Sequence, residues 1–194
     1  MLSYKESLKI LKETSALLEG HFILSSGLHS DKYVQCAKLL SKPKQAKELC
    51  LSLSEKIREK YKNIDLILSP AMGGIVIGYE IGRILNIETI FAERVDGKFN
   101  LRRGFQIKNG QKVLIVEDVI TTGKSSLECS ELAKKAKAEI IGYACIIDRS
   151  NGKSKIDKTI VSQVQIEIPT YKKENLPSNL KKISITKPGS RYLK

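Results

Sequence analysis

The stretch Val113–Ser126, VLIVEDVITTGKSS, is the most informative part of this chain. An apolar run ends in two acids, Glu117 and Asp118, and a loop rich in hydroxyl groups follows them. The next residues, SSLECSELAKKAKA, have the apolar spacing of a helix. In open α/β sheets, ligands bind where the carboxyl end of a strand leads through a loop into a helix. The stretch therefore predicts a strand, a ligand-binding loop and a helix.

The segments on either side alternate between expected strands and expected helices. DLILSP, ETIFAE and EIIGYACIIDRS are typical of short buried strands, whereas PKQAKELCLSLSEKIREKY and GIVIGYEIGRILN are typical of helices. Strands that are apolar throughout and alternate with helices indicate a parallel sheet that is covered on both faces. The expected fold class is therefore α/β, with a central, mostly parallel sheet flanked by helices.

Other segments have different patterns. YKESLKILKETSALLEG predicts an N-terminal helix that ends at Gly20, and HFILSSGLHSDKYVQCA predicts two short strands around a Ser/Gly turn. RVDGKFNLRRGFQIKNG is polar, basic and punctuated by glycine, so we expect it to be a connection. The C-terminal part holds one more strand-like run and then becomes rich in Lys, Pro and Ser.

Composition limits the class of partner. The 194 residues carry 34 Lys+Arg against 21 Asp+Glu, a net charge of +13 that favours anionic ligands. Because the excess is spread thinly, we expect small phosphorylated ligands and no nucleic acid. No apolar run approaches the roughly 20 residues of a membrane-spanning helix, so we expect no membrane partner and a cytoplasmic location. The four cysteines form no C-x-x-C pair, which favours buried free thiols over a zinc site.

The loop after the two acids has the features of an anion site. The expected helix presents unpaired N–H groups and the positive end of its dipole. Gly123 lets the backbone approach a ligand closely. Hydroxyl donors are supplied by Thr121, Thr122, Ser125 and Ser126.

A nucleoside-triphosphate P-loop is excluded by one residue. That motif, G-x-x-x-x-G-K-[ST], requires a glycine where this chain has Asp118, whose carboxylate would repel the β- and γ-phosphates. The acids instead suit a ribose 5-phosphate, with the phosphate on the loop and the 2- and 3-hydroxyls donating to Glu117 and Asp118. Two carboxylates beside C1 would also stabilise positive charge that develops on the sugar.

Four segments of the chain resemble a known family. VLIVEDVITTGKS is similar to the phosphoribosyl-pyrophosphate (PRPP) signature of the type I phosphoribosyltransferases. Gly20–Leu40, GHFILSSGLHSDKYVQCAKLL, resembles the N-terminal hood of orotate phosphoribosyltransferases. SPAMGGIVIG resembles the family's pyrophosphate loop, and FAERVDGKFNLRRGF its mobile catalytic loop. The resemblance covers about residues 20 to 150, in the family's order.

The resemblance implies an organisation and a reaction. Residues 1–40 would form a helix and a hood over the base site, and 41–194 a core with a Lys-rich tail, all in one structural unit. The reaction would transfer ribose 5-phosphate from PRPP to N1 of orotate, giving orotidine 5′-monophosphate and pyrophosphate. Mg²⁺ would be the cofactor and would be held mainly by PRPP. The family also implies a homodimer with shared active sites.

The resemblance further implies a role for individual residues. The expected catalytic residues are Glu117, Asp118 and Lys98. The expected PRPP contacts are Arg94, Lys98, Glu117, Asp118, Val119, Ile120, Thr121, Thr122, Gly123, Lys124 and Ser125. Orotate would be bound by Thr121 and Arg149. The pyrophosphate loop would comprise Ala71, Met72, Gly73 and Gly74, with a cis peptide bond between the first two.

The chain departs from the family pattern at three positions. Val95 and Asn100 stand where better-studied members have a Lys and a His in the mobile loop, and Ser25 stands where they have a Lys in the hood. Arg102 and Arg103 are further candidates for contacts with the diphosphate. His29 is the only nearby imidazole, although a histidine in a turn is more often a hydrogen-bonding surface residue than a catalytic one.

Two other functions share the signature. A purine phosphoribosyltransferase would contain the PRPP loop but not the hood of residues 20–40. A PRPP-binding nucleic-acid regulator would keep the loop without a working mobile loop. The basic ERVDGKFNLRRG segment and the lack of an added helix-turn-helix module argue against the regulator.

Overall fold

The computed structural model describes residues 1–24 and 26–188. Its core is a six-stranded sheet in the order β5-β4-β3-β6-β7-β8. Neighbouring strands are parallel except β4 and β5, which are antiparallel. The strands are β3 (Leu66–Pro70), β4 (Thr89–Val95), β5 (Lys98–Leu101), β6 (Lys112–Ile120), β7 (Glu139–Asp148) and β8 (Ile160–Gln165). The predicted α/β class with a mostly parallel sheet is confirmed.

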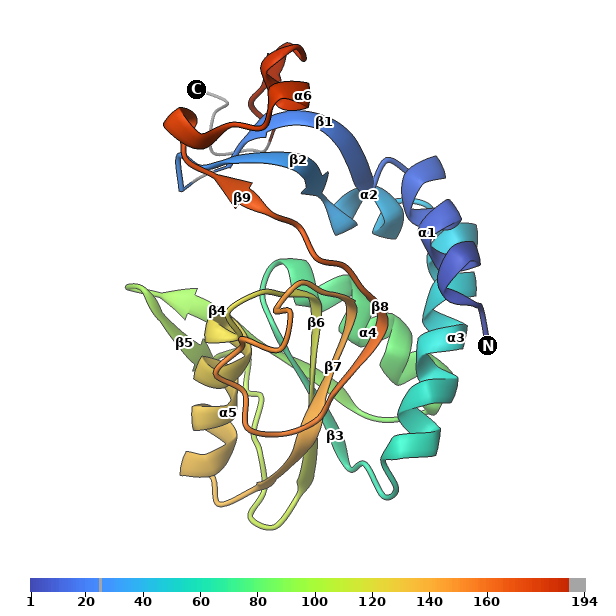
Figure 1. The fold of residues 1–194 in the computed structure, drawn as a ribbon. Helices are drawn as coiled ribbons and strands as arrows, with labels where there is room; N and C mark the ends of the chain where they lie inside the picture. Colours follow the sequence, from blue (N-terminus) through green and yellow to red (C-terminus); the bar gives the residue numbers. More distant parts are fainter. Residues whose placement is uncertain (25, 189–194) are drawn as a thin grey trace.

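Helices cover both faces of this sheet (Figure 1). On one face lie α1 (Tyr4–Glu13), α3 (Pro43–Lys60) and α4 (Gly73–Leu85), and on the other lies α5 (Lys124–Lys135). Strand β6 shows why both faces are apolar. Its alternate residues Leu114 and Val116 pack with α3 and α4, whereas Val113 and Ile115 pack with α5. No helix of the described residues is both long and apolar enough to cross a membrane.

A second, four-stranded sheet forms the hood above the core in Figure 1. Its central strands are β1 (Leu17–Ile23) and β2 (His29–Val34), which form the expected antiparallel pair. Its outer strands come from the other end of the chain: β9 (Thr170–Tyr171) beside β2, and β10 (Ile185–Thr186) beside β1. The hood expected from residues 1–40 alone therefore needs a correction, because C-terminal strands pair with the outer sides of β1 and β2.

Short helical segments complete the chain. Helix α2 (Cys36–Leu40) leads from the hood to Pro43, which opens α3 in its first turn as predicted. In the C-terminal part, η1 (Lys173–Asn175) and α6 (Ser178–Lys181) lie between β9 and β10. The connection of residues 149–159 between the parallel strands β7 and β8 contains no helix.

Two elements differ from their predictions. Helix α1 ends at Glu13 rather than Gly20, because the Thr14 hydroxyl donates to the carbonyls of Ile10 and Leu11 and Ser15 takes a left-handed φ of 58°. Leu17 and Leu18 consequently belong to β1. The expected connection after Arg94 is in fact the β4–β5 hairpin.

The hairpin has a physical cause in the sequence. Its two turn residues, Asp96 and Gly97, have φ angles of 48° and 78°. A two-residue turn with both φ angles positive matches the twist of paired strands, and Asp-Gly favours it.

Candidate active site

The two acids lie at the end of β6, on the edge of the sheet that faces the hood. Glu117 and Asp118 are half-buried, and β6 continues past them to Ile120. The Ile120 side chain is buried in the core on the α5 side, and Val119 packs against the core on the other face. Of these two predicted PRPP contacts, Ile120 therefore offers its backbone rather than its side chain, whereas Val119 also lines a cavity beside Asp118.

Burial changes the acidity of both carboxyl groups. It raises the pKa of Glu117 to about 7, an effect that the negative charge of Asp118 increases and a hydrogen bond from the Ser126 hydroxyl opposes. Burial also raises the pKa of Asp118, although the Val119 N–H donates to its Oδ1 over 2.9 Å. Ser126, expected as a phosphate donor, is buried and instead donates to Glu117.

The loop after the acids leads directly into α5. Thr121, Thr122 and Lys124 are exposed, and Ser125 is half-buried. Gly123 has a left-handed φ of 76°, and a Cβ there would lie 2.8 Å from the Ile156 side chain. Glycine is thus required by both backbone conformation and close packing. The loop presents hydroxyl groups at the N-terminus of a 12-residue helix, where an anion is favoured.

The predicted pyrophosphate loop approaches the acids from β3. The peptide bond between Ala71 and Met72 is cis, as the resemblance implied. Gly73 and Gly74 form the first residues of α4 rather than a separate turn. A Cβ on Gly73 would lie 2.8 Å from Asp118 Oδ1, and one on Gly74 would lie 3.1 Å from the Val116 carbonyl oxygen. The glycines therefore bring the N-terminus of α4 against the acidic strand end.

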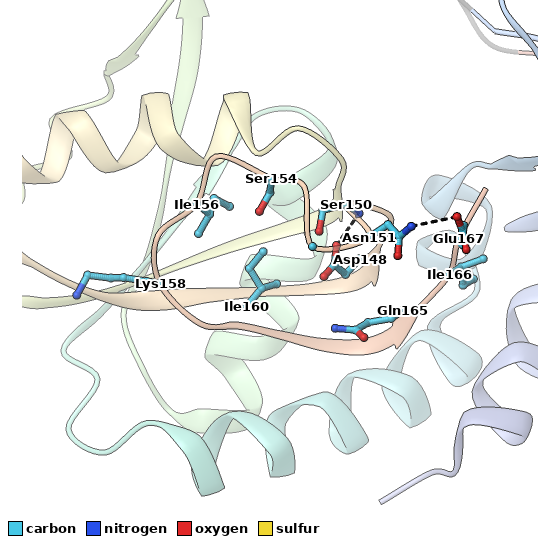
Figure 2. Close-up of a pocket in the computed structure, with 11 residues that line it drawn as sticks. Asp148, Ser150, Asn151, Ser154, Ile156, Lys158, Ile160, Gln165, Ile166 and Glu167 are labelled. Atoms are coloured by element: carbon cyan, nitrogen blue, oxygen red, sulfur yellow. Dashed lines mark hydrogen bonds between the residues drawn. The ribbon is translucent and has the colours of Figure 1, made fainter. Parts of the chain in front are cut away.

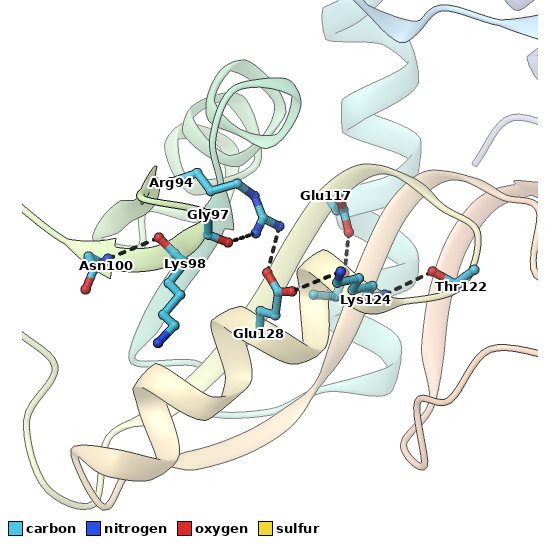
Figure 3. A network of polar contacts seen from close by, with 9 residues as sticks. Arg94, Gly97, Lys98, Asn100, Glu117, Thr122, Lys124 and Glu128 are labelled. Carbon is cyan, nitrogen blue, oxygen red and sulfur yellow. Dashed lines mark hydrogen bonds and ion pairs between the residues drawn. The ribbon is translucent and has the colours of Figure 1, made fainter. Parts of the chain in front are cut away.

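The hairpin lies on the α5 side of the site (Figure 3). Arg94 forms an ion pair with Glu128 of α5, with 2.6 Å between Nη2 and Oε2. Figure 3 shows the Lys98 side chain directed away from Glu117. The predicted catalytic lysine therefore does not meet the acids of its own chain in this structure.

The remaining loop residues are held within the hairpin. Arg103 Nε donates to Glu93 Oε1 over 2.6 Å, and Arg102 lies 3.6 Å from Glu93 Oε2. Val95 is 37% exposed, and Asn100 Nδ2 donates to the Lys98 carbonyl over 3.0 Å. The two candidate arginines thus neutralise a neighbouring acid. The third departure from the family pattern, Ser25, lies outside the described residues.

Arg149 is placed between the core and the hood. Its backbone N–H donates to the Ile120 carbonyl over 2.8 Å, which ties it to the loop that contains Thr121. Burial lowers the pKa of the Arg149 guanidinium, whereas the nearby Tyr33 of β2 raises it. Its Nε is buried and donates to no acceptor among the described residues. A desolvated donor of this kind suits a ligand carboxylate.

A cavity of about 460 Å³ separates the hood from the core beside Asp118. Hood residues Val34 and Gln35 form one wall, and Met72 and Val76 of the α4 side form another. The Cys36 thiol, which also lines it, is 3.9 Å from the Asp118 carbonyl oxygen. The cavity is large enough for a small ligand, and Asp118 is one of its lining residues.

Sequence reasoning missed a second cavity, of about 550 Å³, beyond the end of β7 (Figure 2). Asp148 Oδ1 accepts from the Ser150 N–H over 2.7 Å, and Asn151 donates to Glu167 over 3.0 Å. Parallel strands are usually joined through a helix. Residues 149–159 have no helical pattern. This indicates that no helix from this connection covers β8, and it is the feature of the sequence that could have predicted the cavity.

His29 is part of the hood rather than of the acid site. It begins β2 and is buried rather than at the surface of a turn as expected, and its Nδ1 lies 2.7 Å from Nε2 of the buried His21. His21 Nδ1 in turn lies 3.2 Å from the Ile183 carbonyl oxygen. The pair joins the two hood strands to the C-terminal segment, which supports a structural role for His29.

Comparison with known proteins agrees with this geometry. Residues 38–178 match the family described as Phosphoribosyl transferase domain. The chain is 46% identical over 188 residues to the orotate phosphoribosyltransferase of Erythrobacter litoralis, covering 96% of this chain and 97% of the relative. It is 47% identical over 187 residues to that of Caldicellulosiruptor saccharolyticus, with the same coverage of 96% and 97%.

A solved structure shows the same fold. The orotate phosphoribosyltransferase of Aeropyrum pernix superposes with a TM-score of 0.69 at 22% identity, covering 81% of this chain and 92% of that one. Identity that low supports the fold alone, whereas the two relatives match nearly the whole sequence. The chain belongs to the phosphoribosyltransferase family, in the orotate phosphoribosyltransferase group.

Proposed function

We propose that this enzyme transfers ribose 5-phosphate from PRPP to N1 of orotate, giving orotidine 5′-monophosphate and pyrophosphate for UMP biosynthesis. The observation that carries the proposal is the position of Glu117 and Asp118. The two half-buried acids lie between the phosphate loop of α5 and the N-terminus of α4. Near-identical length and 46% identity to a named orotate phosphoribosyltransferase support the same reaction.

The geometry suggests how the sugar is bound and activated. The 5-phosphate would accept hydrogen bonds from the loop Thr121–Ser125 and from the first N–H groups of α5. The ribose hydroxyls would donate to Glu117 and Asp118. As the bond from C1 to pyrophosphate breaks, positive charge grows on the ring next to these carboxylates. Because the carboxylates are fixed and poorly solvated, they would stabilise the transition state more than the ground state.

Orotate would occupy the side of the site that faces the hood. The Arg149 guanidinium would bind its carboxylate with two hydrogen bonds, an interaction that partial burial strengthens. Thr121, next to the Arg149–Ile120 backbone contact, would supply a further hydrogen bond. The hood strand that contains Tyr33 would limit the access of water to the reacting atoms.

Magnesium suits this site as a cofactor held mainly by substrate. Glu117 and Asp118 offer hard carboxylate oxygens. Among the described residues, no group of three or more His, Cys, Asp or Glu side chains could hold a metal ion alone. The two acids are therefore the residues that would contact a Mg²⁺ carried in by PRPP. When bound, the ion would offset negative charge on the diphosphate.

We also propose a homodimer in which sites are shared. Met72, Val76 and Tyr79 are 81%, 51% and 64% exposed and follow one another at helical spacing on the α4 side. An exposed apolar surface of this kind is typical of a protein interface. Lys98, which points away from its own acids, would then act in the neighbouring site. Four buried cysteines, all free thiols, support a reducing location such as the cytoplasm.

A direct assay tests the reaction. The enzyme is mixed with orotate, PRPP and Mg²⁺, and the loss of orotate absorbance is followed, with parallel samples that lack PRPP or Mg²⁺. We expect loss only in the complete mixture. Consumption of purine bases with orotate unchanged would favour a purine phosphoribosyltransferase. No reaction with either base, together with RNA binding, would favour the regulator.

A further inference from the structure

One ion pair joins the β4–β5 hairpin to helix α5. Arg94 Nη2 lies 2.6 Å from Glu128 Oε2 (Figure 3). Arg94 Nη1 also donates to the Gly97 carbonyl over 2.6 Å, and the guanidinium carbon lies 4.1 Å from the centre of the Phe99 ring. Arg94, a predicted diphosphate contact, is therefore held by its own hairpin and by a carboxylate of α5.

Glu128 interacts with two expected anion-binding residues at once. Its Oε1 lies 3.9 Å from Lys124 Nζ, at the start of α5, while its Oε2 contacts Arg94. Glu128 Oε2 is buried and accepts no hydrogen bond from any residue in the described ranges. The contact with Arg94 is thus an attraction of charges without hydrogen-bond geometry. A diphosphate, with more charge and better acceptors, would bind the same guanidinium more strongly.

We propose that Glu128 competes with the diphosphate of PRPP for Arg94. Binding of the diphosphate transfers Arg94 from Glu128 to the substrate and breaks this ion pair between the hairpin and α5, while Phe99 stays packed in the core. The inference rests on the proposed function, which supplies the diphosphate. The opposite arrangement, in which Glu128 keeps Arg94 oriented while Arg94 binds the diphosphate, predicts the opposite effect of removing the Glu128 charge.

The base of the hairpin limits how much of it is released. Glu93, the residue before Arg94, accepts from Arg103 Nε at 2.6 Å and from Arg103 Nη2 at 3.2 Å. Arg103 follows β5, so this pair joins the two ends of the hairpin. The movement therefore involves the Arg94 side chain and the exposed turn of the hairpin, while the Glu93–Arg103 pair keeps the two ends together and Phe99 stays buried in the core.

Binding of magnesium pyrophosphate, measured by calorimetry, tests the competition. Glu128→Gln removes the charge and keeps the shape, and we expect about two- to fivefold tighter binding, the range of a partly exposed ion pair. Glu131→Gln is the matched control, because Glu131 lies on the same helix and pairs with Lys134 at 2.9 Å. The gain should vanish when Arg94→Ala is also present. Unchanged or weaker binding by Glu128→Gln would overturn the competition.

Hydrogen exchange of the hairpin amides provides a second readout that needs no substrate. The amides of residues 95–99 should exchange faster in Glu128→Gln than in the wild type or in Glu131→Gln. Equal exchange in all three proteins would overturn the docking of the hairpin on α5. A wild type that neither binds pyrophosphate nor consumes orotate would instead overturn the proposed function, whatever the exchange rates show.

Discussion

Asp118 is the residue whose charge matters most to the proposed reaction. Its carboxylate is half-buried between β6 and α4, so Asp118→Asn keeps the shape and removes only the charge. Because the cation on the sugar exists only in the transition state, we expect turnover to fall by about 100-fold or more while the KM for PRPP changes little. Steady-state kinetics with PRPP varied would check this. A loss of affinity with turnover preserved would contradict the assigned role.

Glu117 makes the stability of the protein depend on pH. Its folded pKa, about 7, lies above the ordinary value of 4.5, so the protonated form is favoured by folding. The stability contributed by this group is complete below pH 4.5 and is lost as the pH rises through about 7. By linkage, the free energy of unfolding should fall by up to about 3 kcal/mol over that window.

Denaturation of the ligand-free protein at pH 5 and pH 8 measures this effect. Glu117→Gln stays neutral, and its amide oxygen can still accept from Ser126. The free energy of unfolding of the variant minus that of the wild type should therefore be larger at pH 8 than at pH 5. Glu131→Gln, on exposed helix surface, should show no such difference. If Glu117→Gln and the wild type differ in stability by the same amount at both pH values, the raised pKa of Glu117 would be contradicted.

The sequence predicts those site residues that are adjacent in the chain and misses those pairs that meet only through tertiary contacts. Glu117, Asp118 and the loop after them form one run, so strand, acids and anion site could be placed together. The pairing of Ser126 with Glu117 spans nine residues and requires the first turn of α5 to fold back on β6. Glu128 reaches Arg94 only because the hairpin folds onto α5.

At the scale of elements, the first turn of α4 sets the position of Asp118. A Cβ on Gly73 would lie 2.8 Å from Asp118 Oδ1, so Gly73→Ala must displace that carboxylate. We expect turnover to fall about 10- to 100-fold, because a small misplacement of a reacting group has an effect of this size. The melting temperature should change little, since alanine is the better helix former.

A double variant separates this effect from general damage. If Gly73→Ala acts through the Asp118 charge, it should cost little further turnover in an Asp118→Asn background. Kinetics of the single and double variants therefore check the assignment. Full additivity of the two losses would show that Gly73 affects the site in another way.

Two elements differ from what their local sequence patterns predict. Leu17 and Leu18 continue the apolar spacing of α1, but the Thr14 cap and the left-handed Ser15 end the helix before them. Asp96-Gly97 is a strong hairpin signal, yet the flanking residues are polar and basic, which favours a loop. The hairpin forms because Phe99 is buried and Arg94 stacks on it. Neither contact is visible in a window of sequence.

At the scale of the whole molecule, the hood sheet is the feature that sequence could not supply. Strands β9 and β10 have two residues each, too few for a periodic pattern. They pair with β2 and β1 from more than 130 residues away in the chain, with Thr170 opposite Ser30 and Ile185 opposite His21. The central strands β3, β6 and β7, in contrast, were predictable because they are buried along most of their length and read as nearly continuous apolar runs.

The proposed dimer has a consequence that can be measured by mixing inactive proteins. If Lys98 acts in the neighbouring site, Lys98→Ala and Asp118→Asn damage different halves of each shared site. A mixed dimer then contains one site with both substitutions and one with neither. After equal mixing and exchange of subunits, half of the dimers are mixed, so activity should recover to about a quarter of the wild-type value. Each variant alone should stay nearly inactive.

The control for this experiment mixes Lys98→Ala with Gly73→Ala/Asp118→Asn, which should rescue equally well because both acid-site changes lie in one half. Formation of mixed dimers is verified by purifying them through a tag on one partner. Mixed dimers that form and remain inactive would place Lys98 and Asp118 in the same half of the site. The hairpin would then have to turn Lys98 toward its own Glu117, opposite to the direction seen in Figure 3.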